Sequence, residues 1–231
     1  MLEVKTVNQF YGESHTLWDL DLIVSEGKCT CLMGRNGVGK TTLLQCIMGL
    51  LPIKSGEILF NGDNLNRKIA EKRATLGIGY VPQGRQIFPL LTVEENLRIG
   101  LPVRRQERNR VPEFIFELFP VLKEMLGRKG GDLSGGQQQQ LAIGRALVID
   151  PKLLILDEPT EGIQPNIVQE IGDIILRLNR EIGLTVLLVE QKLPFARKVA
   201  DHFSILDRGR QVAAGEITQL DDELIRRYLT V

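Results

Sequence analysis

Met33-Gly34-Arg35-Asn36-Gly37-Val38-Gly39-Lys40-Thr41-Thr42 is the stretch that decides the fold. Residues 28–33 lead into it as a β-branched and apolar strand, and residues 43–48 follow with the apolar spacing of a helix packed against a sheet. Residues 34–41 fit G-x-x-x-x-G-K-[ST], the pattern of a phosphate-binding loop. A Gly-rich turn without a ligand is the alternative, and the flanking strand and helix argue against it.

The chemistry of this loop needs these residue types. Glycines let successive backbone N–H groups curl around phosphate oxygens, and the following helix points its positive dipole end at the same anion. Lys40 is expected to reach the β- and γ-phosphates of a nucleoside triphosphate, and the Thr41 hydroxyl to ligate Mg²⁺. The residues of the loop expected to bind nucleotide are Gly34, Arg35, Asn36, Gly37, Val38, Gly39, Lys40, Thr41 and Thr42.

The composition of the 231 residues is that of an ordinary globular chain. Lys and Arg together number 29, as do Asp and Glu, so no net field favours nucleic acid. No apolar run reaches the roughly 18 to 20 residues that span a bilayer, and residues 1–5 do not resemble a signal peptide. We therefore expect a protein that works in the cytosol, or on a membrane only through a partner. Cys29, Cys31 and Cys46 are expected to be reduced packing residues.

Strands and helices are expected to alternate along the chain. Two strands within residues 2–24 predict a small antiparallel layer before the phosphate loop. Apolar runs at residues 152–156 and 184–189 are typical of parallel strands buried on both faces. This order predicts an α/β fold with a parallel sheet and right-handed crossovers. A hairpin over residues 203–214 and one amphipathic helix over residues 217–229 are expected to end it.

No strand signal interrupts residues 92–147, so this span is expected to be an all-helical insert. Thr92 and Glu95 predict a capping box at the start of its first helix. Four arginines make one of its connections basic, namely Arg104, Arg105, Arg108 and Arg110. They could touch nucleic acid, but no aromatic residues are interleaved with them, so a solvated surface stretch is the favoured interpretation.

An acid pair, Asp157-Glu158, follows the apolar run at residues 152–156. At the carboxyl end of a parallel strand this pair would lie beside the phosphate loop. Asp157 could then hold Mg²⁺, and Glu158 could accept a proton from an attacking water. Two adjacent carboxylates can also form a solvated turn, but their combination with Lys40 and Thr41 favours catalysis.

A second candidate anion site lies in residues 132–140. Ser134 can cap the helix that follows, and Gly135 and Gly136 expose the first N–H groups of that helix. An ordinary Ser-Gly-Gly helix start is the alternative. Leu-Ser-Gly-Gly-Gln at residues 133–137, between a phosphate loop and an apolar run that ends in Asp-Glu, resembles the ATP-binding cassette ATPases.

The resemblance covers essentially the whole chain and implies one domain over residues 1–231. Residues 1–91 and 148–231 would form a P-loop NTPase core with a parallel sheet and an antiparallel β layer, and residues 92–147 an all-helical signature subdomain. The resemblance further implies that two cassettes close head to tail, so that each ATP lies between Lys40 of one copy and Ser134 of the other. Binding would close the pair, and hydrolysis would reopen it.

The resemblance also implies individual roles. Tyr11 would stack on adenine, with a hairpin core tyrosine as the alternative interpretation. The implied signature contacts to ATP are Ser134, Gly135, Gly136 and Gln137, and the implied Mg²⁺ ligands are Thr41, Gln83 and Asp157. Gln83 would also contact the attacking water and link the sheet to the helical insert. The residues implied for catalysis are Lys40, Glu158 and Gln191.

Two departures from the family pattern stand out. Residues 159–162 read Pro-Thr-Glu-Gly where many relatives carry Ser-Ala-Leu-Asp in the loop after the catalytic glutamate, which puts the cross-subunit contact of this loop in doubt. Gln191 takes the place of the usual histidine. Its amide can donate a hydrogen bond to the γ-phosphate but cannot become charged near neutral pH. We therefore expect hydrolysis to survive without a histidine-like titration.

A glutamine at this position is similar to the ATPases of branched-chain amino acid and urea importers. Residues 33–39, 80–89 and 158–165 are most similar to the urea-transport subgroup. The resemblance implies an ATPase subunit that is peripheral to the cytoplasmic face of the plasma (inner) membrane and does not bind nucleic acid. Its implied partners are transmembrane permease subunits, a second ATP-binding subunit and, indirectly, a periplasmic or extracellular solute-binding protein. Urea is the expected solute, with branched-chain or other amino acids as the alternative.

Two other classes of protein stay open at this point. A small-molecule or nucleoside kinase would share residues 34–41 but has no use for residues 133–137. A non-transport cassette protein of DNA repair or translation would be expected to carry a long coiled coil or two cassettes in tandem, and the sequence has neither.

Overall fold

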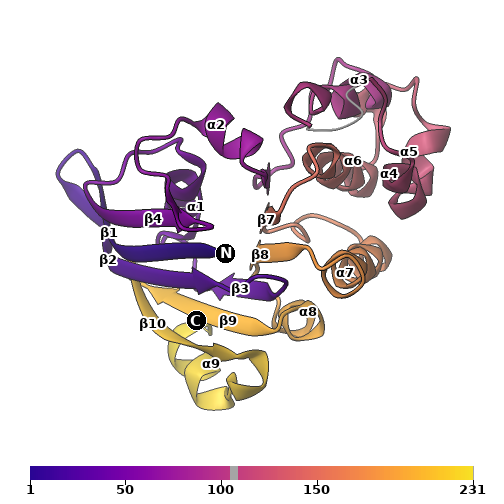
Figure 1. Ribbon diagram of the computed structural model, residues 1–231. Helices are drawn as coiled ribbons and strands as arrows, with labels where there is room; N and C mark the ends of the chain where they lie inside the picture. The colour runs from indigo at the N-terminus through magenta and orange to yellow at the C-terminus, as the bar shows by residue number, and fades with distance from the viewer. Residues whose placement is uncertain (105–108, 231) are drawn as a thin grey trace.

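The protein is described by a computed structural model over residues 1–104 and 109–230. A six-stranded sheet in the order β10-β9-β3-β8-β7-β6 forms its centre (Figure 1). Its parallel strands are β3 (Cys29–Met33), β6 (Ile78–Val81), β7 (Leu153–Asp157), β8 (Thr185–Val189) and β9 (His202–Asp207). Every residue of β3, β7 and β8 is buried, because helices or the second sheet cover both faces. The predicted α/β fold with a parallel sheet is confirmed.

A second, antiparallel sheet lies at the N-terminal side. It has the order β2-β1-β4-β5, with β1 at Leu2–Tyr11, β2 at Ser14–Val24, β4 at Ser55–Phe60 and β5 at Asp63–Asn64. Its apolar side chains share one hydrophobic core with helix α1 (Lys40–Met48) and with one face of the parallel sheet. The predicted antiparallel layer is therefore present, and α1 is enclosed between two sheets.

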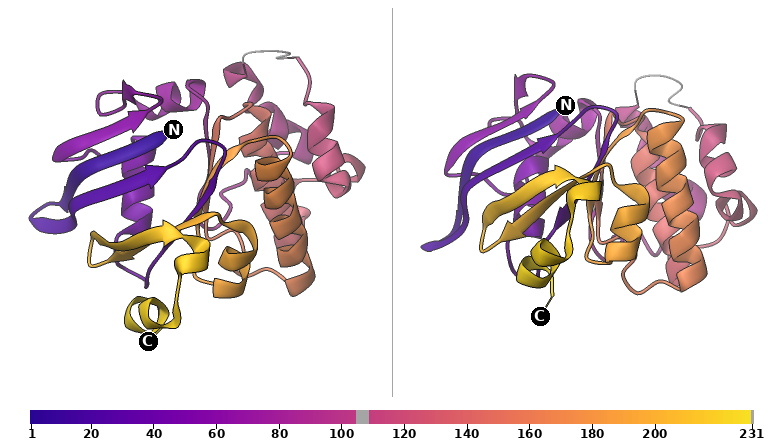
Figure 2. Two further views of the ribbon diagram at one scale, coloured as in Figure 1. Left: turned by 60° about the horizontal axis from the view of Figure 1, so that its bottom comes forward. Right: turned by 90° about the horizontal axis from the view of Figure 1, so that it is seen from below.

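The other face of the parallel sheet is covered by α7 (Pro165–Arg180) and α8 (Leu193–Val199). Apolar side chains of α7, among them Ile171 and Ile175, pack in one core with Leu154 and Leu156 of β7. Both views in Figure 2 place the antiparallel sheet and helix α7 on opposite sides of the molecule. None of the described helices is long and apolar enough to cross a membrane.

The described residues between 92 and 148 form a separate group of helices at one end of the sheet (Figure 1). They are α3 (Val93–Arg98), η1 (Leu101–Val103), α4 (Glu113–Leu118), α5 (Pro120–Glu124), η2 (Gly130–Asp132) and α6 (Gly135–Val148). No described residue of this span lies in a strand, as predicted. The capping box of α3 is confirmed, because the Thr92 hydroxyl accepts from Glu95 N and the Glu95 carboxylate accepts from Thr92 N. Of the four arginines in the basic connection, Arg105 and Arg108 lie outside the described residues.

One buried arginine closes the carboxyl end of α1. Arg73 belongs to the short helix α2 (Ala70–Thr75) and is 3% exposed. Its guanidinium donates to four backbone carbonyls at 2.7–2.8 Å, those of Cys46, Ile47, Leu65 and Lys68. Since the last carbonyls of a helix have no partner within the helix, this side chain supplies hydrogen-bond donors to two of them, and Cys46 O also accepts from Gly49 N.

The C-terminal prediction needs one correction. Residues 217–229 were expected to form a single helix, but the chain forms η3 (Ile217–Gln219) and then α9 (Asp222–Tyr228) after the predicted hairpin of β9 and β10 (Arg210–Glu216). The break falls at Asp221, whose side chain accepts from Leu224 N at 2.9 Å and so caps a new helix. The helical spacing of apolar residues continues across Asp221, so the sequence pattern alone did not indicate a break there.

Candidate functional site

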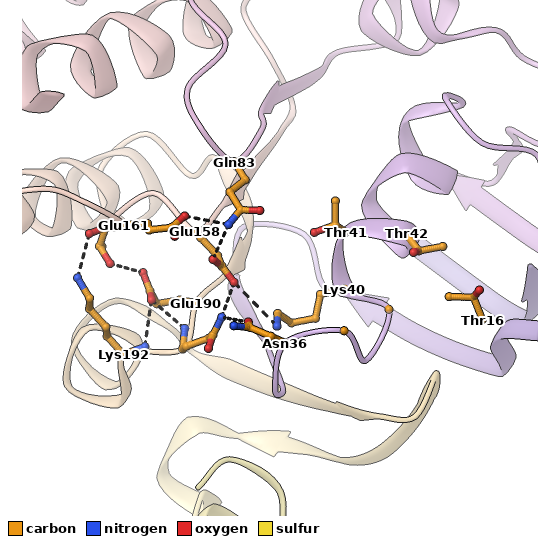
Figure 3. A pocket seen from close by; sticks show the side chains of 14 residues that line it. Thr16, Asn36, Lys40, Thr41, Thr42, Gln83, Glu158, Glu161, Glu190 and Lys192 are labelled. Atoms are coloured by element: carbon orange, nitrogen blue, oxygen red, sulfur yellow. Dashed lines mark hydrogen bonds and ion pairs between the residues drawn. The ribbon is translucent and has the colours of Figure 1, made fainter. Parts of the chain in front are cut away.

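A cavity of about 510 Å³ opens at the carboxyl ends of the parallel strands. Its walls come from the loop before α1, the loops after β7 and β8, and Gln83 after β6 (Figure 3). This is the edge of an α/β sheet where ligands commonly bind. The sequence stretches expected to act together therefore meet in one place.

The phosphate-binding loop has the backbone that its glycines predicted. Gly34, Gly37 and Gly39 all have positive φ, at 145°, 78° and 107°. A Cβ on Gly34 would lie 2.4 Å from the carbonyl oxygen of Leu206, so only glycine fits there. Gly39 is the N-cap of α1, whose N-terminus therefore faces the cavity. Backbone N–H groups at a helix start form a site for a phosphate group.

Lys40 brings a positive charge to this loop while being only 6% exposed. Its Nζ donates to the carbonyls of Gly34 at 2.8 Å and Arg35 at 2.9 Å, and it lies 3.9 Å from Glu158 Oε1. Burial lowers the pKa of Lys40, and the charges of Glu158 and Asp157 act against that shift. The ammonium is thus held at the cavity wall, where it can meet an anion.

Asp157 and Thr41 present oxygen atoms side by side. The Thr41 hydroxyl donates to Asp157 Oδ2 at 3.5 Å, and Asp157 is 2% exposed. Burial, and then the neighbouring charge of Glu158, raise the pKa of Asp157 to about 6, so a cation nearby would stabilise its ionised form. A carboxylate beside a hydroxyl is a donor set that suits a hard cation such as Mg²⁺.

Glu158 occupies a strained position at the end of β7. Its φ of 48° is in the left-handed region, which costs a residue with a side chain about 1 kcal/mol or more. Its carboxylate accepts from Gln191 Nε2 at 2.5 Å and from Gln83 Nε2 at 3.1 Å. Gln191 Nε2 also donates to Asn36 Oδ1 at 2.7 Å. The structure therefore gathers the expected residues Asn36, Lys40, Gln83, Glu158 and Gln191 around one cavity (Figure 3).

The expected signature residues lie elsewhere. Ser134 is the N-cap of α6, with its hydroxyl accepting from Gln137 N at 3.3 Å and Gln137 Oε1 accepting from Ser134 N at 2.9 Å. None of Ser134, Gly135, Gly136 and Gln137 lines this cavity. In one copy of the chain, the two candidate anion sites are thus separate.

Four more expected nucleotide contacts do not line the cavity, namely Tyr11, Gly34, Arg35 and Val38. Tyr11 is 48% exposed, and its hydroxyl lies 3.5 Å from Thr42 Oγ1. The Arg35 guanidinium donates to the carbonyl of Thr230 near the C-terminus. The structure leaves the adenine role of Tyr11 a prediction, and neither Arg35 nor its partner Thr230 lines the cavity.

Five residues that line the cavity were not expected from the sequence, namely Thr16, Thr160, Glu161, Glu190 and Lys192. Four of them lie within three residues of Glu158 or Gln191, and that proximity was the available signal. No sequence signal pointed to Thr16, because contacts between segments distant in the sequence bring its strand to the phosphate-binding loop. Gly209 N donates to the carbonyl of Val38, and Trp18 N donates to that of Gly209, both at 2.9 Å.

Comparisons with known proteins agree with this geometry. The family model described as "ABC transporter" matches residues 17–161. The chain is 43% identical over 213 residues to the "High-affinity branched-chain amino acid transport ATP-binding protein BraG" of Pseudomonas aeruginosa, covering 92% of this chain and 91% of the relative. It is 38% identical over 221 residues to the "Probable branched-chain amino acid transport ATP-binding protein LivF" of Archaeoglobus fulgidus, covering 95% and 94%.

A solved structure similar to this one is a dimeric ATP-binding cassette in a post-hydrolysis state bound to ADP and Pi. It has a TM-score of 0.85 and 28% identity, covering 94% of this chain and 99% of that chain. A nucleotide-free cassette from an ABC transporter has a TM-score of 0.84 and 29% identity, covering 99% and 94%. The chain therefore belongs to the ABC transporter family and is one of its ATP-hydrolysing subunits.

Proposed function

We propose that the chain binds Mg·ATP in this cavity and hydrolyses it to power an importer of small solutes across a membrane. The observation that carries the proposal is the meeting of Lys40, Glu158 and Gln191 around one cavity beside a glycine-rich helix N-terminus. A kinase would share the loop, but family membership supports the cassette interpretation over it. One cassette domain spans residues 1–231, with residues 92–147 as its signature subdomain.

In the reaction, water attacks the γ-phosphorus and the bond to the β–γ bridging oxygen breaks. Glu158 orients the water and accepts its proton, while Gln191 Nε2 keeps one N–H on the Glu158 carboxylate and transfers the other from Asn36 Oδ1 to the γ-phosphate. Lys40 and the N–H groups of the loop offset the negative charge of the transferring phosphoryl group. The Thr41 hydroxyl, Asp157 and Gln83 would hold Mg²⁺, which supplies positive charge to the phosphate oxygens when bound.

The donor set for Mg²⁺ is small. Among the described residues, no group of three or more His, Cys, Asp or Glu could hold a metal ion. At a nucleotide, Mg²⁺ keeps several waters and takes further ligands from the phosphates, so few protein ligands are required. The fit thus rests on the Asp157 carboxylate and the Thr41 hydroxyl beside the phosphate loop, together with the amide oxygen of Gln83.

A second ATP-binding subunit completes the site. Ser134 and the N-terminus of α6 lie outside the cavity of their own chain, and they would cover the ATP of a neighbouring cassette. The dimeric cassette structure similar to this one supports that arrangement. Transmembrane permease subunits would dock on the helical subdomain at the cytoplasmic face of the plasma (inner) membrane, and a solute-binding protein would act through them.

Two observations point to the imported solute. The names of the relatives in Pseudomonas and Archaeoglobus favour branched-chain amino acids, and the motif at residues 80–89 favours urea, as the sequence resemblance implied. Uptake of labelled leucine and of labelled urea by cells with and without the gene distinguishes these solutes. Loss of leucine uptake alone excludes urea, and loss of urea uptake alone excludes the amino acids.

Replacement of the proposed base tests the catalytic assignment. Glu158→Gln is expected to lower turnover to a small residual rate while ATP binding is kept, so that an ATP-bound dimer accumulates in gel filtration. The matched control is Glu223→Gln, which removes an exposed carboxylate on α9 and should hydrolyse ATP at the wild-type rate. Wild-type turnover in Glu158→Gln would refute the assignment.

A second experiment tests the shared site. Lys40→Ala removes the charge in the phosphate loop of one copy, and Ser134→Arg blocks the N-terminus of α6 in the other. Each variant alone should be inactive, whereas a mixture should regain turnover from dimers with one intact site. Mixtures that stay inactive would contradict the shared site.

A further inference from the structure

Glu190 is a buried carboxylate at the end of β8 that the reaction scheme above does not use. It is 3% exposed, and its backbone N–H donates to the carbonyl of Leu32 at 3.3 Å. Its Oε1 accepts from the backbone N–H groups of Gln191 at 2.8 Å and Lys192 at 3.0 Å. Its Oε2 accepts from the Thr160 hydroxyl at 2.6 Å. Three donors from two loops therefore converge on one carboxylate (Figure 3).

Thr160 ties the loop after β7 to the loop after β8. Its side chain is buried, with 1% of the residue exposed, and its backbone carbonyl accepts from Lys192 Nζ at 2.9 Å. The two loops thus exchange hydrogen bonds in both directions. Because Thr160 and Glu190 are buried, breaking the bond between their side chains leaves a polar group without water to replace its partner.

These contacts close a ring around the two proposed catalytic side chains. Glu158 is two residues before Thr160, Thr160 donates to Glu190, Glu190 precedes Gln191, and Gln191 donates back to Glu158. We propose that Glu190 is a positioning residue that, through Thr160, fixes the Glu158 carboxylate against the Gln191 amide. The inference rests on the proposed function, since it presumes that Glu158 and Gln191 act on the γ-phosphate.

The strain at Glu158 explains why such a tether is needed. A residue with φ of 48° keeps that conformation only when its surroundings hold it there. The backbone N–H of Glu158 is fixed by the carbonyl of Val189 at 2.9 Å, and the tether at Thr160 fixes the chain on its other side. A carboxylate suits the tether because it only accepts hydrogen bonds, whereas a glutamine would turn an NH₂ group toward donors.

Thr160→Val is the sharpest test, because it removes the hydroxyl at nearly constant volume, and Thr160→Ser is its matched control. With the full chain and saturating Mg·ATP, Thr160→Val should lower kcat at least about 10-fold, as small misplacements of catalytic groups do. KM and the binding of a fluorescent ATP analogue should change less than about 2-fold, because the tether does not touch the phosphate loop. Thr160→Ser should keep kcat within about 3-fold of wild type.

A double variant separates positioning from a general structural defect. In the Glu158→Gln background, Thr160→Val should change the residual rate less than about 2-fold, because the group it positions is already gone. Glu190→Gln should reproduce the kcat loss, and circular dichroism should show that each variant is folded.

Three results would overturn the inference. One is wild-type kcat in Thr160→Val, and another is equal loss in Thr160→Val and Thr160→Ser. The third is an undiminished effect of Thr160→Val in the Glu158→Gln background. Wild-type turnover in Glu158→Gln alone would instead refute the proposed function, and the role of the tether with it.

Discussion

Replacing Asp157 by asparagine is expected to stabilise the protein in the absence of Mg²⁺ and nucleotide. Asp157 is 2% exposed, and its main partner is the Thr41 hydroxyl at 3.5 Å. Burial and the charge of Glu158 make its ionised form costly. Asparagine has nearly the same shape and can accept the same hydrogen bond, but it carries no charge.

The size of this effect follows from the pKa of the carboxyl. The pKa of Asp157 rises from 3.8 to about 6. At pH 7.5, ionisation of this carboxyl is therefore less favourable in the folded protein than in the unfolded chain. About 2 pKa units at about 1.4 kcal/mol each give roughly 3 kcal/mol in favour of Asp157→Asn. Below about pH 6 the folded carboxyl takes up its proton first, so the advantage shrinks between pH 6 and pH 4 and is lost below the unfolded pKa.

Urea denaturation at pH 7.5 and pH 5, with EDTA and without nucleotide, measures this difference in the free energy of unfolding. The exposed Asp63 provides a control, because Asp63→Asn should change the unfolding free energy by less than about 0.5 kcal/mol at both pH values. An Asp157→Asn variant no more stable than wild type at pH 7.5 would contradict the reasoning. A gain that does not shrink at pH 5 would do so as well.

Three further predictions concern other parts of the chain. At saturating Mg·ATP, whose cation would keep Asp157 ionised, the hydrolysis rate should show no histidine-like titration between about pH 6 and 7, because Gln191 stands where a histidine could charge; a stopped assay across this range that finds such a step in parallel with ATP binding would count against it. Arg73→Met should cost about 3 kcal/mol in urea denaturation, because four buried or partly buried carbonyls each lose a hydrogen bond, and Arg67→Met on the surface should cost almost nothing. The three cysteines should not react with a thiol reagent until the chain unfolds, because burial raises the pKa of Cys29 to about 12 and of Cys46 to about 11; fast labelling of the folded protein would refute this.

What could be predicted from the sequence was local in the chain. The phosphate-binding loop depends on glycine conformations and a helix start within residues 34–41, and the predicted capping box at Thr92 and helix cap at Ser134 span four residues each. Asp157 and Glu158 were found because an apolar run delivers them to the carboxyl end of a strand. Interactions between residues that are close in the sequence are sufficient to determine such features.

What could not be predicted depends on how distant segments align. The bond between Thr160 and Glu190 exists because β7 and β8 are neighbours in a register that pairs Asp157 with Val189. Neither the order of strands nor their register can be read from the spacing of apolar residues. The same limit applies to Thr16, which reaches the cavity through the hairpin at Gly209.

Trp18 offers a spectroscopic consequence of that hairpin. It is the single tryptophan of the chain, its backbone N–H bonds to Gly209, and the Arg210 guanidinium lies 5.3 Å from its ring centre. All indole fluorescence therefore comes from a side chain two residues away from Thr16, which lines the cavity. An optical titration of the unlabelled protein thus observes the neighbourhood of the phosphate loop without a competing signal from the helical subdomain.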